Sequence, residues 1–151
     1  VAHVLLGLGL PSLHIVDRLP ERACSLAADL ALRFPARNII VASDVAAALT
    51  GADGVINATP IGMEKYPGSP FDTALIRPDL WVADIVYFPL ETELLRIAAA
   101  RGCRTLNGGG MVVHQAAAAF EIFTGLKADA GRMMRSFLEY SRRPGARAAG
   151  D

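Results

Sequence analysis

The stretch GVINATPIGM, from Gly54 to Met63, decides the fold of this chain. It opens as a short apolar strand and ends in a turn that contains Asn57, Thr59 and Pro60. A hydrophobic strand that runs directly into such residues is hard to explain by packing alone. In open parallel sheets, ligands bind beyond the carboxyl ends of the strands. The stretch therefore predicts a strand whose end faces a ligand.

Short apolar runs alternate with longer helical segments along the rest of the chain. Strands are expected at residues 13–17, 38–43, 54–59, 81–87 and 103–108. Helices are expected at residues 20–34, 44–51, 91–102, 111–125 and 129–143. Strands that alternate with helices indicate βαβ units and a parallel sheet. The predicted fold class is α/β, a doubly wound parallel sheet flanked by helices.

Capping residues support these helix boundaries. Asp44 and Asp129 stand where helices begin, and a carboxylate there accepts an orphan backbone N–H. Pro20 occupies a plausible first helical position. Gly102 and Gly125 follow the last apolar residues of two helices, where glycine commonly ends a helix.

Composition excludes several classes of partner. The chain has 151 residues, about one domain, with 15 basic and 15 acidic residues, so no net charge steers it to nucleic acid or an anionic membrane. No apolar run reaches the ~18 residues of a membrane span, and no signal-peptide pattern is present. Cytoplasm is the expected location. Cys24 and Cys103 are expected to be reduced core thiols.

The two ends of the chain carry their own expectations. VAHVLLGLGL resembles a helix already in progress that Gly7 or Gly9 closes, which predicts that a first strand and glycine loop of the fold belong upstream. The tail, residues 144–151, is expected to be disordered. The predicted domain therefore covers residues 1–143 as a partial nucleotide-binding domain.

Asp17 is a candidate for cofactor recognition. A carboxylate at this strand end accepts hydrogen bonds from the adenosine ribose and repels the 2′-phosphate of NADP. The alternative is a turn role, because strands often end in Asp. Arg18 could instead hold a phosphate, which leaves NADP open beside NAD. Arg22 either stacks on adenine or is a solvated helix arginine. The G-x-G-x-x-G fingerprint is absent, but NGGGM (107–111) precedes a helix and could let the backbone approach a ligand.

Three motifs together resemble the second half of the shikimate/quinate dehydrogenase family. They are VINATPIGM, DIVYFPLETELL and NGGGMVVHQAAAAFEIFTG, and the resemblance runs from Asp17 to about Leu138. These enzymes interconvert 3-dehydroshikimate with shikimate, or dehydroquinate with quinate, using NADP or NAD. The resemblance implies a Rossmann-like nucleotide-binding domain. Asp17-Arg18-Leu19 departs from the Asn-Arg-Thr sequence usual in NADP-preferring members and is similar to the NAD-using branch. The sequence around His114 is also similar to that branch.

The resemblance also implies roles for single residues. The residues expected along the cofactor are Asn57, Ala58, Thr59, Pro60, Met63, Ile85 and Gly108. Of these, Ile85 is expected near the nicotinamide ring and Gly108 against the nicotinamide amide. Tyr87 and Gln115 are expected to contact the substrate. Tyr87 could equally be an ordinary strand-end tyrosine. Gln115 is read as a buried amide in the first turn of its helix, and its partner is either a backbone group or, as favoured here, a substrate hydroxyl. His114 is read as a packing or surface group.

The proton donor is not expected within these residues. In the family, a Lys paired with an Asp supplies it from a preceding substrate domain. Lys65 matches no such position and is expected to be a solvated loop residue, while Asp84 is expected to accept backbone N–H groups from a loop. This chain by itself is therefore expected to be inactive.

The predicted function is NAD(P)-dependent dehydrogenation of a small molecule, shikimate or quinate. No nucleic acid, membrane or metal partner is expected, and a homodimer is left open. Two other classes compete: a non-catalytic nucleotide-sensing module and a purely structural or oligomerisation domain.

Overall fold

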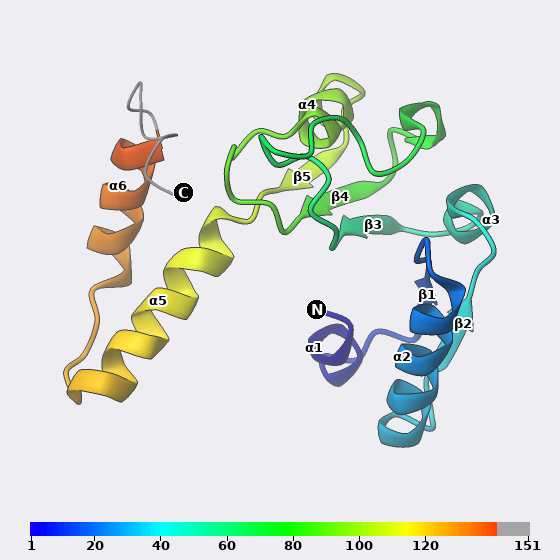
Figure 1. Cartoon of the computed structure of the whole chain (residues 1–151), viewed down its shortest axis with the longest axis horizontal. Coiled ribbons are helices and arrows are strands. Elements are labelled where there is room, and N and C mark those ends of the chain that lie inside the picture. Colours follow the sequence, from blue (N-terminus) through cyan, green and yellow to red (C-terminus); the bar gives the residue numbers. More distant parts are fainter. Residues whose placement is uncertain (142–151) are drawn as a thin grey trace. The chain divides into compact units, whose positions relative to one another are not determined.

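The computed structural model describes residues 1–141 and has an α/β fold, as predicted (Figure 1). Its elements in chain order are α1 (Ala2–Gly7), β1 (Ser12–Ile15), α2 (Pro20–Arg33), β2 (Asn38–Val41), α3 (Val45–Leu49), β3 (Gly54–Asn57), the 3-10 helix η1 (Thr73–Leu75), β4 (Trp81–Asp84), α4 (Glu93–Ala100), β5 (Arg104–Leu106), α5 (Gly109–Thr124) and α6 (Ala130–Ser141). The predicted disordered tail, 144–151, lies outside the described residues. The chain divides into two compact units at residues 53 and 54.

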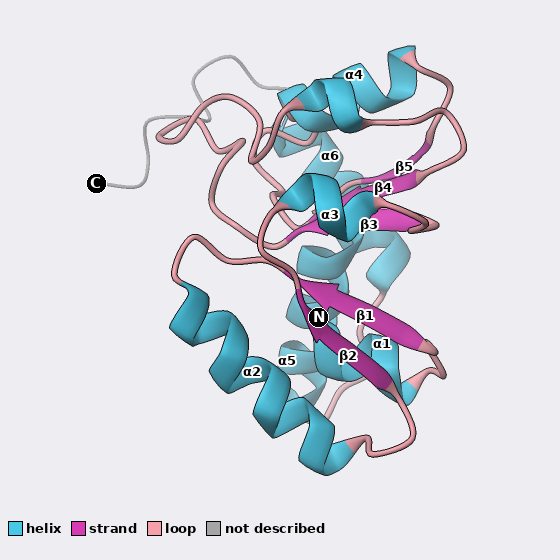
Figure 2. Ribbon diagram, turned by 90° about the vertical axis from the view of Figure 1, so that its right-hand side faces the viewer, coloured by secondary structure: helices cyan, strands magenta, loops and turns pink. Residues whose placement is uncertain are grey.

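The first unit, Val1–Asp53, contains a two-stranded parallel sheet. β1 and β2 pair from Ser12 opposite Asn38 to Ile15 opposite Val41, and α2 packs on β2 (Figure 2). The Nδ1 atom of His14 lies 3.0 Å from the carbonyl oxygen of Ala48, so a ring N–H there ties β1 to α3. The buried apolar residues of this unit are Leu6, Ala23, Leu30, Ala48 and Leu49.

The second unit, from Gly54 onward, contains a three-stranded parallel sheet in the order β3-β4-β5. β4 is the central strand, and its Val82 is fully buried. The apolar face of α4, which carries Leu94, Leu95 and Ala98, covers β4 and β5. The parallel pairing was predicted; the division of the strands into two sheets, one in each unit, was not.

Helix ends follow the capping pattern closely. Asp44 Oδ1 accepts the Ala47 N–H at 2.8 Å, and this bond lowers the pKa of Asp44 below its ordinary value. Asp129 Oδ1 accepts the Arg132 N–H at 2.9 Å, and Gly125 ends α5 in the left-handed conformation. α5 begins at Gly109, two residues before the expected start.

α5 and α6 form an antiparallel helical hairpin in the second unit (Figure 1). Phe137 of α6 approaches Gly109 at the start of α5, and Glu121 Oε1 accepts the Ala128 N–H of the connecting loop at 3.0 Å. In the described residues α6 therefore packs on α5; that it also packs toward a substrate domain stays a prediction.

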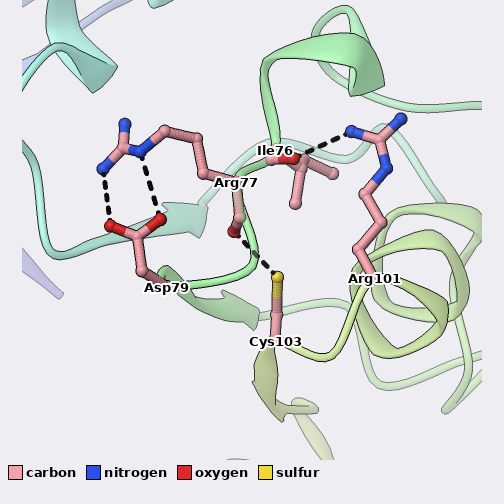
Figure 3. A network of polar contacts seen from close by, with 5 residues as sticks. All are labelled: Ile76, Arg77, Asp79, Arg101 and Cys103. Carbon is pink, nitrogen blue, oxygen red and sulfur yellow. Dashed lines mark hydrogen bonds and ion pairs between the residues drawn. The ribbon is translucent and has the colours of Figure 1, made fainter.

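A polar network holds the loop that leads into β4 (Figure 3). The Arg101 guanidinium donates to the carbonyl oxygens of Ile76, at 2.9 Å, and of Thr73. Cys103 Sγ donates to the Arg77 carbonyl oxygen at 3.1 Å. The Arg77 side chain pairs with Asp79 at 3.2 Å and lowers the pKa of that carboxyl group. These contacts lie at the amino ends of β4 and β5.

The two cysteines differ in environment. Cys103 is buried beside the β4 loop, as predicted, and both thiols are free. The prediction of a core position for Cys24 is wrong, because Cys24 lies on the exposed face of α2 while Ala23 faces inward. Within residues 1–141, no helix combines the length and apolar character needed to cross a membrane.

Candidate active site at the carboxyl ends of β3, β4 and β5

Polar side chains end two neighbouring strands of the second unit. Asn57 is the last residue of β3, Asp84 is the last residue of β4, and the two are register partners. Both are only 3% exposed. Because parallel strands place their carboxyl ends at one edge of the sheet, this is the edge at which α/β proteins bind ligands.

The Asn57 amide is committed to internal hydrogen bonds. Its Nδ2 group donates to Asp84 Oδ1 at 3.0 Å and to the Ile61 carbonyl oxygen at 2.8 Å. Its Oδ1 atom accepts from the Thr59 N–H at 3.0 Å and from the Thr59 hydroxyl at 2.7 Å. Both donors and both acceptor sites are thus used. The side chain shapes the turn from inside and has no capacity left to bind a ligand directly.

The Asp84 carboxylate joins three segments of the chain. Its Oδ1 atom accepts from the Val86 N–H at 3.0 Å as well as from Asn57. Its Oδ2 atom accepts from the Thr92 hydroxyl at 2.8 Å. The expectation of backbone donors is confirmed for Val86, but the other two donors are side chains. Pairing of this kind is what lets a carboxylate remain buried.

Thr92 is the residue that the sequence analysis missed. It is 1% exposed, and its hydroxyl accepts the Leu95 N–H at 3.3 Å while donating to Asp84. It is the N-cap of α4, whereas the sequence analysis began this helix at residue 91. The sequence signal for this N-cap was a threonine directly before Glu93 and an apolar helical run.

The turn after β3 presents an exposed rim. The Thr59 hydroxyl accepts the Ile61 N–H at 3.2 Å, which tightens the turn. Gly62 has a φ of 107° and lies against Thr92, where a side chain would crowd the threonine methyl group. The exposed residues of the rim are Ala58, Thr59, Pro60 and Met63. All four are predicted cofactor residues, and the structure leaves their side chains accessible.

The segment after β4 continues this edge. The Ile85 N–H donates to the Asn57 carbonyl oxygen at 3.0 Å, so Ile85 still follows β3. Its side chain is half-buried, and that of Tyr87 is 44% exposed. Among the described residues the Tyr87 hydroxyl makes no hydrogen bond, so it is available to a ligand.

Gly108 lies at the same edge in a role that the sequence analysis did not foresee. A Cβ atom there would stand 2.3 Å from the Ile85 carbonyl oxygen and 2.8 Å from that of Val86. The Gly108 N–H donates to the Val86 carbonyl oxygen at 3.2 Å. The close approach that requires glycine is therefore to the protein backbone. The predicted contact with a nicotinamide amide stays a prediction.

Two expectations about Gln115 are wrong. It is the seventh residue of α5, in the second turn, because the helix begins at Gly109. Its side chain is exposed among the described residues, so no buried amide needs a partner. The alanines around it misled the sequence analysis, since small side chains also cover exposed helix faces. His114 is exposed, as one of its two readings predicted.

The predicted adenosine-end residues belong to the first unit. Asp17 follows β1, and its Oδ1 atom accepts the Leu19 N–H at 2.9 Å, so the carboxylate does take the turn role. Asp17, Arg18 and Arg22 are exposed. Asp17 Oδ2 makes no hydrogen bond within the described part of the chain.

Other chemistry is sparse in the described residues. Residues 1–141 hold no cluster of His, Cys, Asp or Glu suited to a metal ion. Lys65 is an exposed loop residue whose Nζ atom lies 5.9 Å from the Tyr66 ring centre, as expected for a solvated lysine. A cavity of about 200 Å³ lies between α4 and the region of β5, lined by Leu90, Glu91, Leu95, Ala99, Thr105 and Asn107.

The parallel strands and the helices between them form a Rossmann-like α/β fold. A family model described as the shikimate 5'-dehydrogenase C-terminal domain matches residues 108–136. The chain is 50% identical over 141 residues to a shikimate dehydrogenase (NADP(+)) of Streptomyces avermitilis, covering 92% of this chain and 48% of the relative. It is 47% identical over 140 residues to a quinate/shikimate dehydrogenase (NAD(+)) of Corynebacterium efficiens, covering 91% and 49%.

A solved structure agrees with these relatives. Quinate dehydrogenase from Corynebacterium glutamicum in complex with NAD superimposes with a TM-score of 0.82 at 43% identity, over 92% of this chain and 50% of that chain. The chain is thus similar to the C-terminal half of shikimate/quinate dehydrogenases. It spans about half the length of the curated relatives that it matches.

Proposed function

We propose that this chain is the cofactor-binding half of an NAD(P)-dependent dehydrogenase that acts on shikimate or quinate. The observation that carries the proposal is the carboxyl edge of β3 and β4. There an internal Asn57–Asp84 pair shapes a turn whose outer residues are exposed, beside a tyrosine with a free hydroxyl. The similar relatives are named for both substrates and both cofactors.

The residues present fit a nicotinamide cofactor. The exposed rim residues Ala58, Thr59, Pro60 and Met63 offer backbone groups and side chains, and half-buried Ile85 offers an apolar surface for a flat ring. In the proposed site Gly108 keeps the backbone close beside Ile85. When bound, a nicotinamide cofactor would supply the hydride acceptor for oxidation of the substrate alcohol to a ketone.

The chain's own residues bind and orient in this proposal. Tyr87 donates from its hydroxyl to the substrate, and exposed Gln115 reaches a substrate hydroxyl from α5. Asp17 accepts from the ribose hydroxyls through Oδ2 while Oδ1 holds the turn. Arg18 and Arg22 lie at the adenosine end. The hydroxyl proton leaves to a base that we place outside these residues, so this chain alone is expected to be inactive.

The test is the initial rate of reduced-nicotinamide formation by the complete gene product. Shikimate and quinate are each offered with NAD⁺ and with NADP⁺. We expect turnover with NAD⁺ preferred, because a carboxylate at Asp17 repels the 2′-phosphate of NADP⁺. Preference for NADP⁺ would indicate that Arg18, which could hold a phosphate, decides recognition at the adenosine end of the cofactor. No turnover in any combination would favour a nucleotide-sensing module.

The same proposal covers location and assembly. A dehydrogenase of this kind acts in the cytoplasm on a small-molecule substrate, without a nucleic-acid or membrane partner. A homodimer is left open, and sedimentation of the complete gene product measures the assembly.

A further inference from the structure

We propose that Thr92 and Asp84 are positioning residues of this site, a role that rests on the proposed function. Neither side chain is exposed to a ligand: Thr92 is 1% exposed and Asp84 is 3% exposed. Each instead contacts a segment that carries predicted ligand residues. The inference is that the start of α4 controls the geometry of the cofactor turn through one buried carboxylate.

The hydrogen bonds run in one connected chain. The N–H of Leu95 donates to Thr92 Oγ1, and the Thr92 hydroxyl donates to Asp84 Oδ2. The carboxylate then accepts at Oδ1 from the Val86 N–H and from the Asn57 amide. Because the single Thr92 proton points at Oδ2, the Oδ1 atom is left to these two donors.

Each end of the chain fixes a different part of the site. The hydrogen bond from the Val86 N–H to Asp84 orients the peptide group that joins Ile85 to Val86, directly before Tyr87. Asn57 passes the constraint to Thr59 and Ile61 in the turn. The Thr92 methyl group packs against Gly62, which has a left-handed backbone that only glycine adopts readily. Thr92 thus packs directly against the turn and is linked to it by hydrogen bonds through Asp84 and Asn57.

The experiment compares three variants of the complete gene product. Thr92→Val keeps the shape of the side chain and removes the hydroxyl. Thr92→Ser keeps the hydroxyl and removes the methyl group. Asp129→Ala is the matched control, because it removes an N-cap of α6 without touching the network. Asp84→Asn replaces Thr92→Val as the test variant if Thr92→Val does not fold. Its amide nitrogen must face either the Thr92 hydroxyl or the Asn57 and Val86 donors, so the network is disturbed in both orientations.

Two measurements are made on each variant. The first is the dissociation constant of the reduced cofactor from its fluorescence, together with KM and kcat for the substrate. The second is hydrogen exchange at the Val86 amide, which reports the geometry without any ligand. A shift of about 1 Å in a reacting group can lower a rate by about a hundredfold. We expect Thr92→Val to weaken cofactor binding about tenfold and to speed Val86 exchange, with Thr92→Ser restoring most of both.

The outcomes separate this inference from the proposed function. Equal losses in Thr92→Val and Asp129→Ala would reduce Thr92 to an ordinary cap and overturn the inference. Faster Val86 exchange with unchanged cofactor binding would overturn it as well, while the proposed function stands. A wild-type protein that binds no nicotinamide cofactor would overturn the proposed function and this inference together.

Discussion

Single side chains at the carboxyl edge of the second sheet divide into those that face inward and those that remain accessible. Asn57 and Asp84 use their polar atoms on each other and on nearby turns. Thr59, Met63 and Tyr87 are exposed. The polar atoms of the inward group are hydrogen-bonded, as buried polar groups generally are, and the group leaves the outer side chains in a defined arrangement. Binding is therefore expected from residues that the inner group holds in place.

Asp17 offers a test of the choice between NAD⁺ and NADP⁺ at a single side chain. Asp17→Asn keeps an oxygen that can accept the Leu19 N–H and so preserves the turn. It removes the negative charge that would repel a 2′-phosphate. We expect the ratio of kcat/KM with NAD⁺ to that with NADP⁺ to fall about tenfold, equivalent to about 1.4 kcal/mol. An unchanged ratio in the complete gene product would remove Asp17 from cofactor selection.

Gly108 and Gly110 form a matched pair for a stability test. Gly108→Ala places a methyl group 2.3 Å from the Ile85 carbonyl oxygen, so the backbone must shift. We expect urea unfolding to show a loss of about 1–3 kcal/mol. Gly110→Ala meets nothing within 4 Å inside α5, so the higher helix propensity of alanine should add up to about 1 kcal/mol. Equal effects of the two substitutions would contradict the close approach at Gly108.

At the scale of elements, β4 has a polar network at each end. At its amino end, Arg101 and Cys103 hold the preceding loop by donating to backbone carbonyl oxygens (Figure 3). At its carboxyl end, Asp84 holds the loops toward α4 and after β3. The strand between them is apolar and buried, with Val82 at its centre. Its ends are therefore constrained by hydrogen bonds and its middle by packing.

The amino-end network predicts local opening of a loop. Arg101→Gln removes the guanidinium that donates to the Thr73 and Ile76 carbonyl oxygens. Hydrogen bonds from charged groups contribute about 1.5–3 kcal/mol, and partial exposure places this loss near the lower value. Hydrogen exchange at Leu75 and Ile76 should therefore accelerate. Arg104→Gln, on exposed β5, is the control and should leave that exchange unchanged.

At the scale of the whole molecule, the chain divides into two compact units that each contain a parallel sheet. The first unit carries the predicted adenosine-end residues, and the second carries the predicted nicotinamide and substrate residues. Ligand residues are thus predicted in each of the two units. Ligand binding should consequently be visible in the stability of the whole protein.

Cofactor binding gives a prediction that separates the three functional classes. A ligand at 100 times its dissociation constant stabilises the native state by about 2.7 kcal/mol when it binds only that state. We expect NAD⁺ to raise the melting temperature of the complete gene product accordingly. A nucleotide sensor would show the same rise without turnover, and a purely structural domain would show no rise.

The sequence by itself determined the order of the helices and strands, the parallel α/β class and the resemblance to shikimate/quinate dehydrogenases. Those signals are local: Asp44 and Asp129 cap the helices that follow them, and Gly125 ends α5. Apolar periodicity and caps act over a few residues, so they can be read along the chain. The motifs also pointed to Ala58, Thr59, Pro60 and Met63 as cofactor residues, although they did not show what shapes the turn that carries them.

Only the tertiary structure decided which polar groups meet. Asn57 and Asp84 are 27 residues apart, and Gly108 contacts the backbone of Ile85, so neither contact has a local pattern. The exposure of Gln115 depends on which face of α5 is covered, and its alanine neighbours carry no information about that. Burial and hydrogen bonding between strand ends arise when the sheet forms, because register places distant residues side by side. For this physical reason Thr92 emerged as part of the site from the fold and not from its motif.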